Sequence, residues 1–190
     1  MESGVPSWLV AGLGNPGARY ARTRHNVGWL VLDALALPES FREEPRFEGA
    51  VSRTDGAWLL KPTTFMNLSG VSVRAMADYY KIPREQVLIV LDDAALPFGR
   101  LRLRPGGSAG GHNGLASVLT HFAAESVPRL RIGVGAPPGA VALPDHVLGK
   151  FSEEEEAALG DLVAQAASAV REVLKNGLAA AMNEFNKERL

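Results

Sequence analysis

The sequence contains no cysteine among its 190 residues. This absence excludes disulfides, thiolate metal sites and a cysteine nucleophile. No segment approaches the roughly 18 to 20 uninterrupted apolar residues that a membrane span requires. Residues 1–6 also lack the basic and apolar regions of a secretory signal. We therefore expect a cytoplasmic protein that has no membrane partner.

The chain also lacks an excess of charge of either sign. It has 20 Lys and Arg against 21 Asp and Glu, which gives a net charge of -1. A basic excess is typical of proteins that bind nucleic acid, so the total argues against that class. With 46% hydrophobic and 22% charged residues, the composition is that of a globular protein rather than a disordered one. The length predicts one domain over residues 1–190.

Hydrophobic patterning predicts strands that alternate with helices. Short apolar or alternating runs predict strands at 7–13, 47–53, 57–61, 87–91, 100–104 and 129–135. Period-3.6 patterns predict helices at 26–37, 68–81, 112–122 and, in a tail divided by Gly177, 152–187. Asn26 is the expected N-cap of the first helix, and Ser152 with Glu155 forms a capping box. The predicted fold is a single three-layer α/β domain whose twisted, mixed, mostly parallel sheet is flanked by helices.

A glycine-rich segment follows the first predicted strand. Residues 12–17 match the dinucleotide-binding pattern G-x-G-x-x-G. That pattern requires a helix to begin within the glycines, so that its N-terminal amides face a pyrophosphate. Here Pro16 and the polar residues 18–25 delay the helix. We therefore interpret the glycines as a turn rather than as a cofactor site.

A second glycine-rich segment at residues 106–110 matches the nucleophile-elbow pattern G-x-S-x-G, with Ser108 as the serine. A serine triad in that arrangement needs an acid and then a histidine further along the chain. The histidines considered as partners are His121 and His146, with Glu125 and Asp145 as the nearby carboxylates, and a triad built from them would be strained. A flexible loop is the favoured interpretation, and a serine esterase stays open as an alternative.

Polar clusters stand where the predicted strands end. One contains Asn15, Tyr20, His25 and Asn26; the others are Met66-Asn67 with Ser69, Asp92-Asp93, and His112-Asn113. Ligands of α/β sheets gather at the carboxyl ends of the strands, so these clusters are expected to converge. A histidine whose tautomer is fixed by a carboxylate can act as a general base, and such a pair is the smallest set of residues that could activate water.

Arginines alternate with leucines along one predicted strand. Arg100, Arg102 and Arg104 would lie about 6.6 Å apart on one face of a strand. Arginines from other strand ends, Arg22, Arg24, Arg129 and Arg131, are expected to extend this basic face. Such a face suits an anionic polymer, although charge that protects an exposed sheet edge explains the spacing equally well.

Several longer motifs follow one another along residues 9–151. They are Gly14-Asn15-Pro16-Gly17 with Tyr20, Thr23-Arg24-His25-Asn26, Lys61-Pro62, Phe65-Met66-Asn67-Leu68-Ser69-Gly70, Asp92-Asp93 with Leu96-Pro97, Gly110-Gly111-His112-Asn113-Gly114, Arg129-Leu130-Arg131-Ile132-Gly133 and Val147-Leu148-Gly149-Lys150. In this order they resemble the bacterial-type peptidyl-tRNA hydrolase family. The resemblance implies a monomeric α/β enzyme with no metal, no cofactor and no obligate protein partner.

The resemblance also implies an activity and a set of site residues. The activity is hydrolysis of the ester between a peptide and the 3′ ribose of tRNA, which recycles stalled peptidyl-tRNA. The implied substrate contacts are to the acceptor stem and 3′ end. The implied catalytic residues are His25 as base, Asp92 as its orienting carboxylate, Asn67 as oxyanion donor, and Asn113. The implied substrate-binding residues are Asn15, Tyr20, Met66, Asn67 and Asn113, and the implied phosphate-binding residues are Arg102, Arg104 and Arg131.

The sequence departs from the family pattern at two places outside these residues. Ala95 stands where members often have a further acid, and Ala136-Pro137 stands where they often have His-Pro. Arginine also replaces the commoner lysine on the basic strand, which changes donor geometry but keeps the charge. Besides the esterase, a relative that binds RNA without hydrolysing it stays open as an alternative.

Overall fold

The structure is a computed structural model that describes residues 7–187; expectations for residues 1–6 lie outside it. Its strands form one seven-stranded sheet in the order β2-β3-β4-β1-β5-β7-β6. The strands are β1 (Trp8–Gly12), β2 (Arg42–Glu44), β3 (Gly49–Thr54), β4 (Ala57–Pro62), β5 (Val87–Asp93), β6 (Leu101–Arg104) and β7 (Arg129–Gly133). The central pairs β4–β1, β1–β5 and β5–β7 are parallel, and the outer pairs are antiparallel. The predicted mixed sheet is therefore confirmed.

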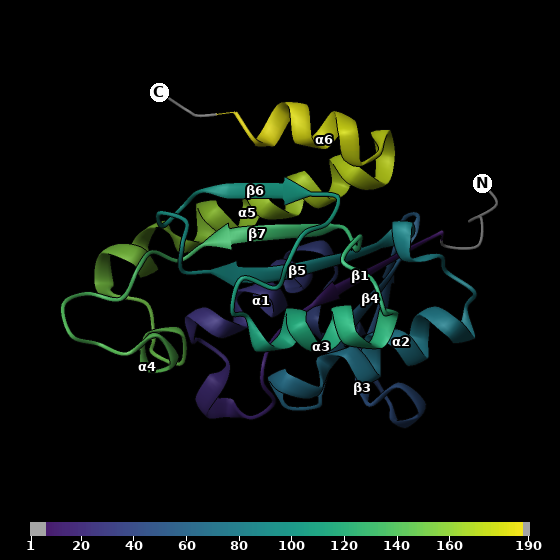
Figure 1. The fold of residues 1–190 in the computed structure, drawn as a ribbon, viewed down its shortest axis with the longest axis horizontal. Helices are drawn as coiled ribbons and strands as arrows, with labels where there is room; N and C mark the ends of the chain where they lie inside the picture. The colour runs from purple at the N-terminus through teal and green to yellow at the C-terminus, as the bar shows by residue number, and fades with distance from the viewer. Residues whose placement is uncertain (1–6, 188–190) are drawn as a thin grey trace.

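Helices cover both faces of this sheet and complete the predicted three layers (Figure 1). On one face α1 (Val27–Leu35), α5 (Glu153–Asn176) and α6 (Leu178–Phe185) bury one side of the central strands. On the other face α2 (Ser69–Tyr79) and α3 (Asn113–Phe122) bury the alternate side. Within residues 7–187, no helix combines the length and the apolar character needed to cross a bilayer.

The C-terminal helices begin and divide where the sequence predicts. The Ser152 hydroxyl accepts a hydrogen bond from the Glu155 backbone N–H, and the Glu155 carboxylate accepts one from the Ser152 N–H. Gly177 then separates α5 from α6 with a positive φ of 87°, a conformation that glycine adopts at little cost.

Two short elements are not predicted by the sequence pattern. The edge strand β2 has three residues, which is too few to show an alternation. The helix α4 (Leu143–Val147) has five residues, which is too few to show a period of 3.6. Asn26 also differs from expectation, because it precedes α1 but its side chain makes no capping hydrogen bond.

The glycines at the end of β1 and just after it, Gly12 and Gly14, are explained by close packing. A Cβ atom on Gly12 would lie 2.5 Å from the Gly28 carbonyl oxygen, and one on Gly14 would lie 2.7 Å from the Trp29 indole nitrogen. Only glycine lets α1 pack this closely on the end of β1. The helix begins at Val27, well beyond the glycines, so the rejection of a dinucleotide fingerprint is supported.

Candidate active site

A cleft of about 850 Å³ opens at the carboxyl ends of β1 and β5. After β1 the chain adds β2, β3 and β4 on one side of β1, and it then crosses to add β5 on the other side. The cleft lies at this change of direction, which is the usual location of ligand sites in α/β sheets. The structure brings most of the sequence-predicted site residues together here. Those that line the cleft are Asn15, His25, Met66, Asn67, Asp92, Arg104, Asn113 and Arg131.

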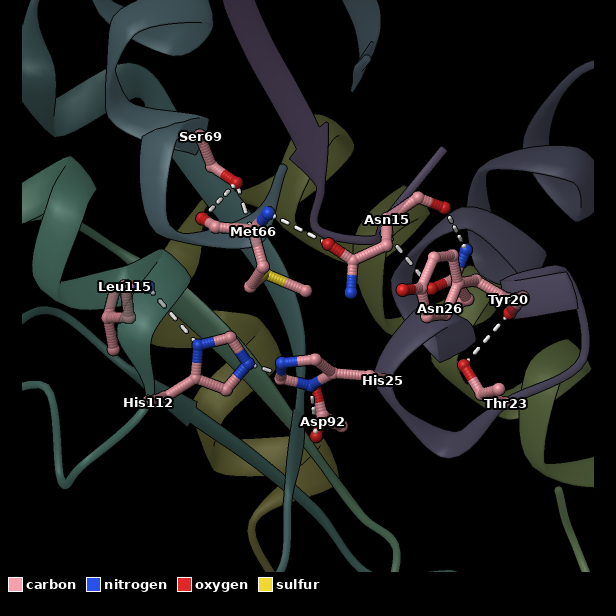
Figure 2. A network of polar contacts seen from close by, with 10 residues as sticks. All are labelled: Asn15, Tyr20, Thr23, His25, Asn26, Met66, Ser69, Asp92, His112 and Leu115. Carbon is pink, nitrogen blue, oxygen red and sulfur yellow. Dashed lines mark hydrogen bonds and ion pairs between the residues drawn. The ribbon is translucent and has the colours of Figure 1, made fainter. Parts of the chain in front are cut away.

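Asn15 is held from both sides of its peptide unit. The fully buried Asn26 accepts a hydrogen bond from the Asn15 backbone N–H at 3.0 Å and donates one to the Asn15 carbonyl oxygen at 2.9 Å. The Asn15 side-chain oxygen accepts a hydrogen bond from the Met66 N–H at 2.8 Å. The Asn15 amide nitrogen is therefore left to donate, and it points into the space beside Met66 and His25 (Figure 2).

His25 and Asp92 form the pair that the sequence predicts. The Nδ1 atom of His25 lies 2.9 Å from both carboxylate oxygens of Asp92. Asp92 is 2% exposed and the His25 side chain is 12% exposed, so the pair is buried except on its cleft side. Because an ionised carboxylate only accepts hydrogen bonds, Nδ1 carries the proton and Nε2 carries the lone pair. This is the tautomer that a histidine base requires.

His112 belongs to one of the polar clusters expected to converge here, but the sequence interpretation assigns it no catalytic or binding role. Its Nε2 atom lies 2.9 Å from Asp92 Oδ1, so the two imidazole rings meet at one carboxylate (Figure 2). Its Nδ1 atom accepts a hydrogen bond from the Leu115 N–H at 3.2 Å, in the N-cap position of α3. This bond fixes the proton of a neutral His112 on Nε2. The only sequence signal for this role is its place beside Asn113, after the glycine-rich loop.

The two histidines determine the charge state of Asp92. Burial on its own would raise the pKa of this carboxyl, but the charge and hydrogen bond of His112, together with those of His25, outweigh burial. The pKa of Asp92 is therefore held well below its ordinary value. Asp92 stays ionised at neutral pH and can orient both rings.

The same three residues could be considered as metal ligands, since one potential ligand atom from each lies within 4.8 Å of the others. The hydrogen bond from Leu115 argues against this use. A metal ion on His112 Nε2 would need that lone pair, so the proton would have to move to Nδ1. Nδ1 could then no longer accept the Leu115 N–H. The arrangement suits two N–H donors on a carboxylate better than it suits an ion.

The remaining predicted residues take different places. Asn67 and Asn113 are exposed in the cleft, and Met66 is buried in its wall. A Cβ atom on Gly114 would lie 2.4 Å from Met66 Sδ, so the glycine allows Met66 to lie close to α3. Tyr20 does not contribute to the cleft lining among residues 7–187, and its hydroxyl accepts a hydrogen bond from Arg19.

The predicted basic face exists, but it is smaller than expected. Arg102 pairs with Arg131 and Arg104 pairs with Arg129 in the β6–β7 register, so these four side chains leave the same face of the sheet. Arg104 is exposed, and both Arg104 and Arg131 line the cleft. Arg131 forms an ion pair with Asp93, and Arg102 lies outside the lining within the described part of the chain.

Three of the arginines expected on this face are engaged elsewhere. Arg129 is 2% exposed and donates hydrogen bonds to backbone carbonyls of the glycine-rich loop and of the segment before β7. Arg24 is buried against Glu155, and Arg22 forms an ion pair with Glu156. The acidic run at the start of α5 therefore neutralises arginines as well as complementing the helix dipole.

The geometry gives no support to a triad around Ser108. Ser108 is exposed in the cleft, and its carbonyl oxygen accepts a hydrogen bond from Arg129. His121 contacts the Ser117 carbonyl oxygen within its own helix, and His146 contacts the Gly135 carbonyl oxygen. Neither of these two lines the cleft formed by the described residues, whereas His112, which also follows Ser108, does line it. His112 cannot serve as the base for Ser108, because its Nε2 atom binds Asp92 and its Nδ1 atom accepts the Leu115 N–H.

Comparison with known proteins places the chain in a family. The family model for peptidyl-tRNA hydrolase matches residues 9–190. A peptidyl-tRNA hydrolase of Chloroflexus aurantiacus is 45% identical over 185 residues, covering 94% of this chain and 98% of the relative. One of Gloeobacter violaceus is 48% identical over 184 residues, covering 94% and 93%. The crystal structure of peptidyl-tRNA hydrolase from Acinetobacter baumannii is 36% identical, with a TM-score of 0.86 over 96% of this chain and 95% of that one. The chain belongs to the peptidyl-tRNA hydrolase family.

Proposed function

We propose that this protein hydrolyses the ester between a peptide and the 3′ ribose of tRNA, with His25 activating the attacking water. The observation that carries the proposal is the buried carboxylate of Asp92, which holds His25 in the tautomer of a base at the wall of an open cleft. An ester has a better leaving group than an amide, so a base and oxyanion donors suffice without a covalent nucleophile. The activity of the family agrees with this chemistry.

The proposed reaction has two steps. His25 Nε2 takes a proton from water while the water oxygen bonds to the ester carbonyl carbon, and the carbonyl oxygen becomes an oxyanion. The carbon–oxygen bond to the ribose then breaks, and the 3′ oxygen takes the proton from His25. Asp92 stabilises the transient imidazolium, because its low pKa keeps it charged. The products are a peptide acid and tRNA with a free 3′ hydroxyl.

Three amides surround the reacting atoms in this proposal. Asn67 donates to the developing oxyanion, and Asn113 positions the water and the ester. The free amide nitrogen of Asn15 donates to a carbonyl group of the peptide. Its fixed orientation means that little rotational freedom is lost when substrate binds.

Exposed apolar side chains of the cleft lining are available to the rest of the substrate. Phe65, next to Met66 in the chain, is 59% exposed and Leu143 of α4 is 47% exposed, and both line the cleft. We assign these side chains to contacts with peptide side chains or with the terminal adenosine. Tyr20, which stands outside the lining, would contact substrate only beyond the cleft. The enzyme is proposed to act as a monomer in the cytoplasm, without cofactor or obligate protein partner.

The activity is tested by measuring release of N-acetyl amino acid from N-acetyl-aminoacyl-tRNA by the wild type and by Ser108→Ala. Both proteins are expected to release product at equal rates. Loss of release in Ser108→Ala alone would favour a serine esterase. No release by a wild type that still binds tRNA would identify a relative that has lost hydrolysis.

The basic face predicts a salt effect. Replacing both Arg102 and Arg104 by alanine is expected to raise KM for tRNA substrates and leave kcat unchanged. The slope of log affinity against log salt concentration should become shallower by about 1 to 2. The reason is that tRNA binding releases about one counterion fewer for each phosphate contact that the variant has lost. Filter binding of deacylated tRNA at several salt concentrations measures this slope.

The control for this experiment removes two arginines from elsewhere on the surface. Arg53→Ala with Arg84→Ala changes the net charge equally, but neither residue lines the cleft within the described residues. This control should keep the wild-type slope. Equal slopes in the two double variants would contradict phosphate binding by Arg102 and Arg104.

A further inference from the structure

The C-terminal end of α6 contacts the edge of the sheet through Asn186. The Asn186 side-chain oxygen accepts a hydrogen bond from the Leu103 N–H at 2.7 Å, and its amide nitrogen donates to the Leu103 carbonyl oxygen at 3.0 Å. One side chain thus makes both hydrogen bonds that a neighbouring strand would make to this residue. The Asn186 carbonyl oxygen also accepts a hydrogen bond from Arg100 at 3.4 Å.

Leu103 needs such a partner because of its place in the sheet. The strand β6 has four residues and stands at the end of the strand order, with β7 as its only strand neighbour among the described residues. In an antiparallel pair, every second residue directs its N–H and C=O away from the partner strand. Leu103 is such a residue, and without Asn186 its polar groups would be left at an open edge.

Asn186 is itself held firmly. The helix α6 packs Ala181 into the core shared by the sheet and α5, and Met182 and Phe185 pack against that core. Figure 1 shows α6 beyond β6, at this edge of the sheet. The amide of Asn186 is therefore presented to Leu103 from a packed helix end.

The residues on either side of Leu103 are Arg102 and Arg104, whose side chains leave the face of the sheet opposite to the buried Leu103 side chain. We propose that Asn186 is a positioning residue for tRNA binding, which fixes the backbone of β6 so that Arg102 and Arg104 project together from one face of the sheet toward RNA phosphates. This inference rests on the proposed function, because it assigns a role to the C-terminal helix at the same basic face. Asn186 would not touch the reacting ester.

The test compares Asn186→Ala with Asn183→Ala, which removes an exposed asparagine from the same helix. Asn186→Ala is expected to raise KM for N-acetyl-aminoacyl-tRNA about three- to tenfold, the range expected for loss of hydrogen bonds that each contribute modestly, and to leave kcat unchanged. Hydrolysis of 3′-O-(N-acetyl-aminoacyl)-adenosine, which lacks the acceptor stem, should stay at the wild-type rate. Asn183→Ala should match the wild type with both substrates.

A second pair, Asn186→Asp and Asn183→Asp, adds one negative charge to the same helix in each case. Asn186→Asp keeps an acceptor for the Leu103 N–H but places a carboxylate oxygen against its carbonyl oxygen, so its affinity for deacylated tRNA should fall more than that of Asn183→Asp. Equal tRNA affinities within both pairs would overturn the proposal. So would equal losses on tRNA and adenosine esters, because they would show general damage to the fold. Binding of deacylated tRNA is scored without catalysis, so these outcomes are distinct from failure of the proposed hydrolysis.

Discussion

Replacing His25 by alanine is expected to lower kcat for release of N-acetyl amino acid by about 10²- to 10⁴-fold, the usual contribution of a general base. KM should change little, because the substrate contacts proposed for Asn15, Asn67 and the arginines remain in place. The fold should also remain, since the His25 ring packs at the cleft wall rather than in either apolar core. Steady-state kinetics on N-acetyl-aminoacyl-tRNA give both constants.

His121→Ala provides the matched control for this substitution. His121 bonds only to a carbonyl of its own helix among the contacts of the described residues, and it lies outside the cleft lining that they form. Its loss should leave kcat and KM at wild-type values. A His25→Ala variant with the kcat of His121→Ala would contradict base catalysis by His25.

Replacing Asp92 by asparagine is expected to reduce kcat on the order of 10⁴-fold, the loss known when the carboxylate that orients a catalytic histidine becomes an amide. The structure supplies a specific reason. An asparagine offers one oxygen acceptor and one NH₂ donor, whereas Asp92 accepts from two rings. His112 must keep its proton on Nε2 because Nδ1 accepts the Leu115 N–H, so it takes the oxygen.

In the Asp92→Asn variant, His25 would then face the NH₂ group of the introduced amide. Its Nδ1 atom must accept, its proton moves to Nε2, and the lone pair needed by the base is lost. Nitrogen NMR of the histidine side chains distinguishes the two tautomers of His25. Asp161→Asn, at an exposed position outside the cleft lining, is the control and should keep both the wild-type tautomer and kcat. An Asp92→Asn enzyme with the wild-type tautomer and full activity would refute the assigned role of Asp92.

The Asp92→Asn substitution should also change how the free energy of unfolding depends on pH. The folded-state pKa of Asp92 lies below its unfolded value, so the unfolded chain binds this proton more readily. The stability that the ionised carboxylate contributes is therefore complete above the unfolded pKa of about 3.9, and it is lost as pH falls from there toward the folded pKa. The difference in unfolding free energy between the wild type and Asp92→Asn should therefore shrink as pH falls below about 4, as the wild type loses the contribution of the ionised carboxylate.

Strand positions and site location follow from patterns that are local in the sequence. The apolar run of β5 and the alternation in β6 and β7 are each long enough to show their period, and the polar clusters come directly after strands. Because neighbouring parallel strands end at one edge, the sequence predicts that Asn15 and Asp92 converge, and both line the cleft.

Other features depend on contacts that no local pattern reveals. The role of His112 arises from a carboxylate 20 residues earlier and from the Leu115 N–H at the start of α3. Arg129 alternates with Leu130 as an exposed residue would, but the glycine-rich loop and the segment before β7 cover it. Asn26 has the position of an N-cap, yet its amide binds Asn15 because the β1 loop lies against it.

Direct attack by water is tested most directly by one single-turnover experiment. N-acetyl-aminoacyl-tRNA is mixed with excess wild-type enzyme, and each quenched sample is analysed for free tRNA, N-acetyl amino acid and intact protein mass. If His25 activates water, tRNA and N-acetyl amino acid appear at the same rate, and the protein keeps its unmodified mass throughout. Release of tRNA before the acid, with the acyl mass attached to the protein at Ser108 or another residue, would contradict this mechanism.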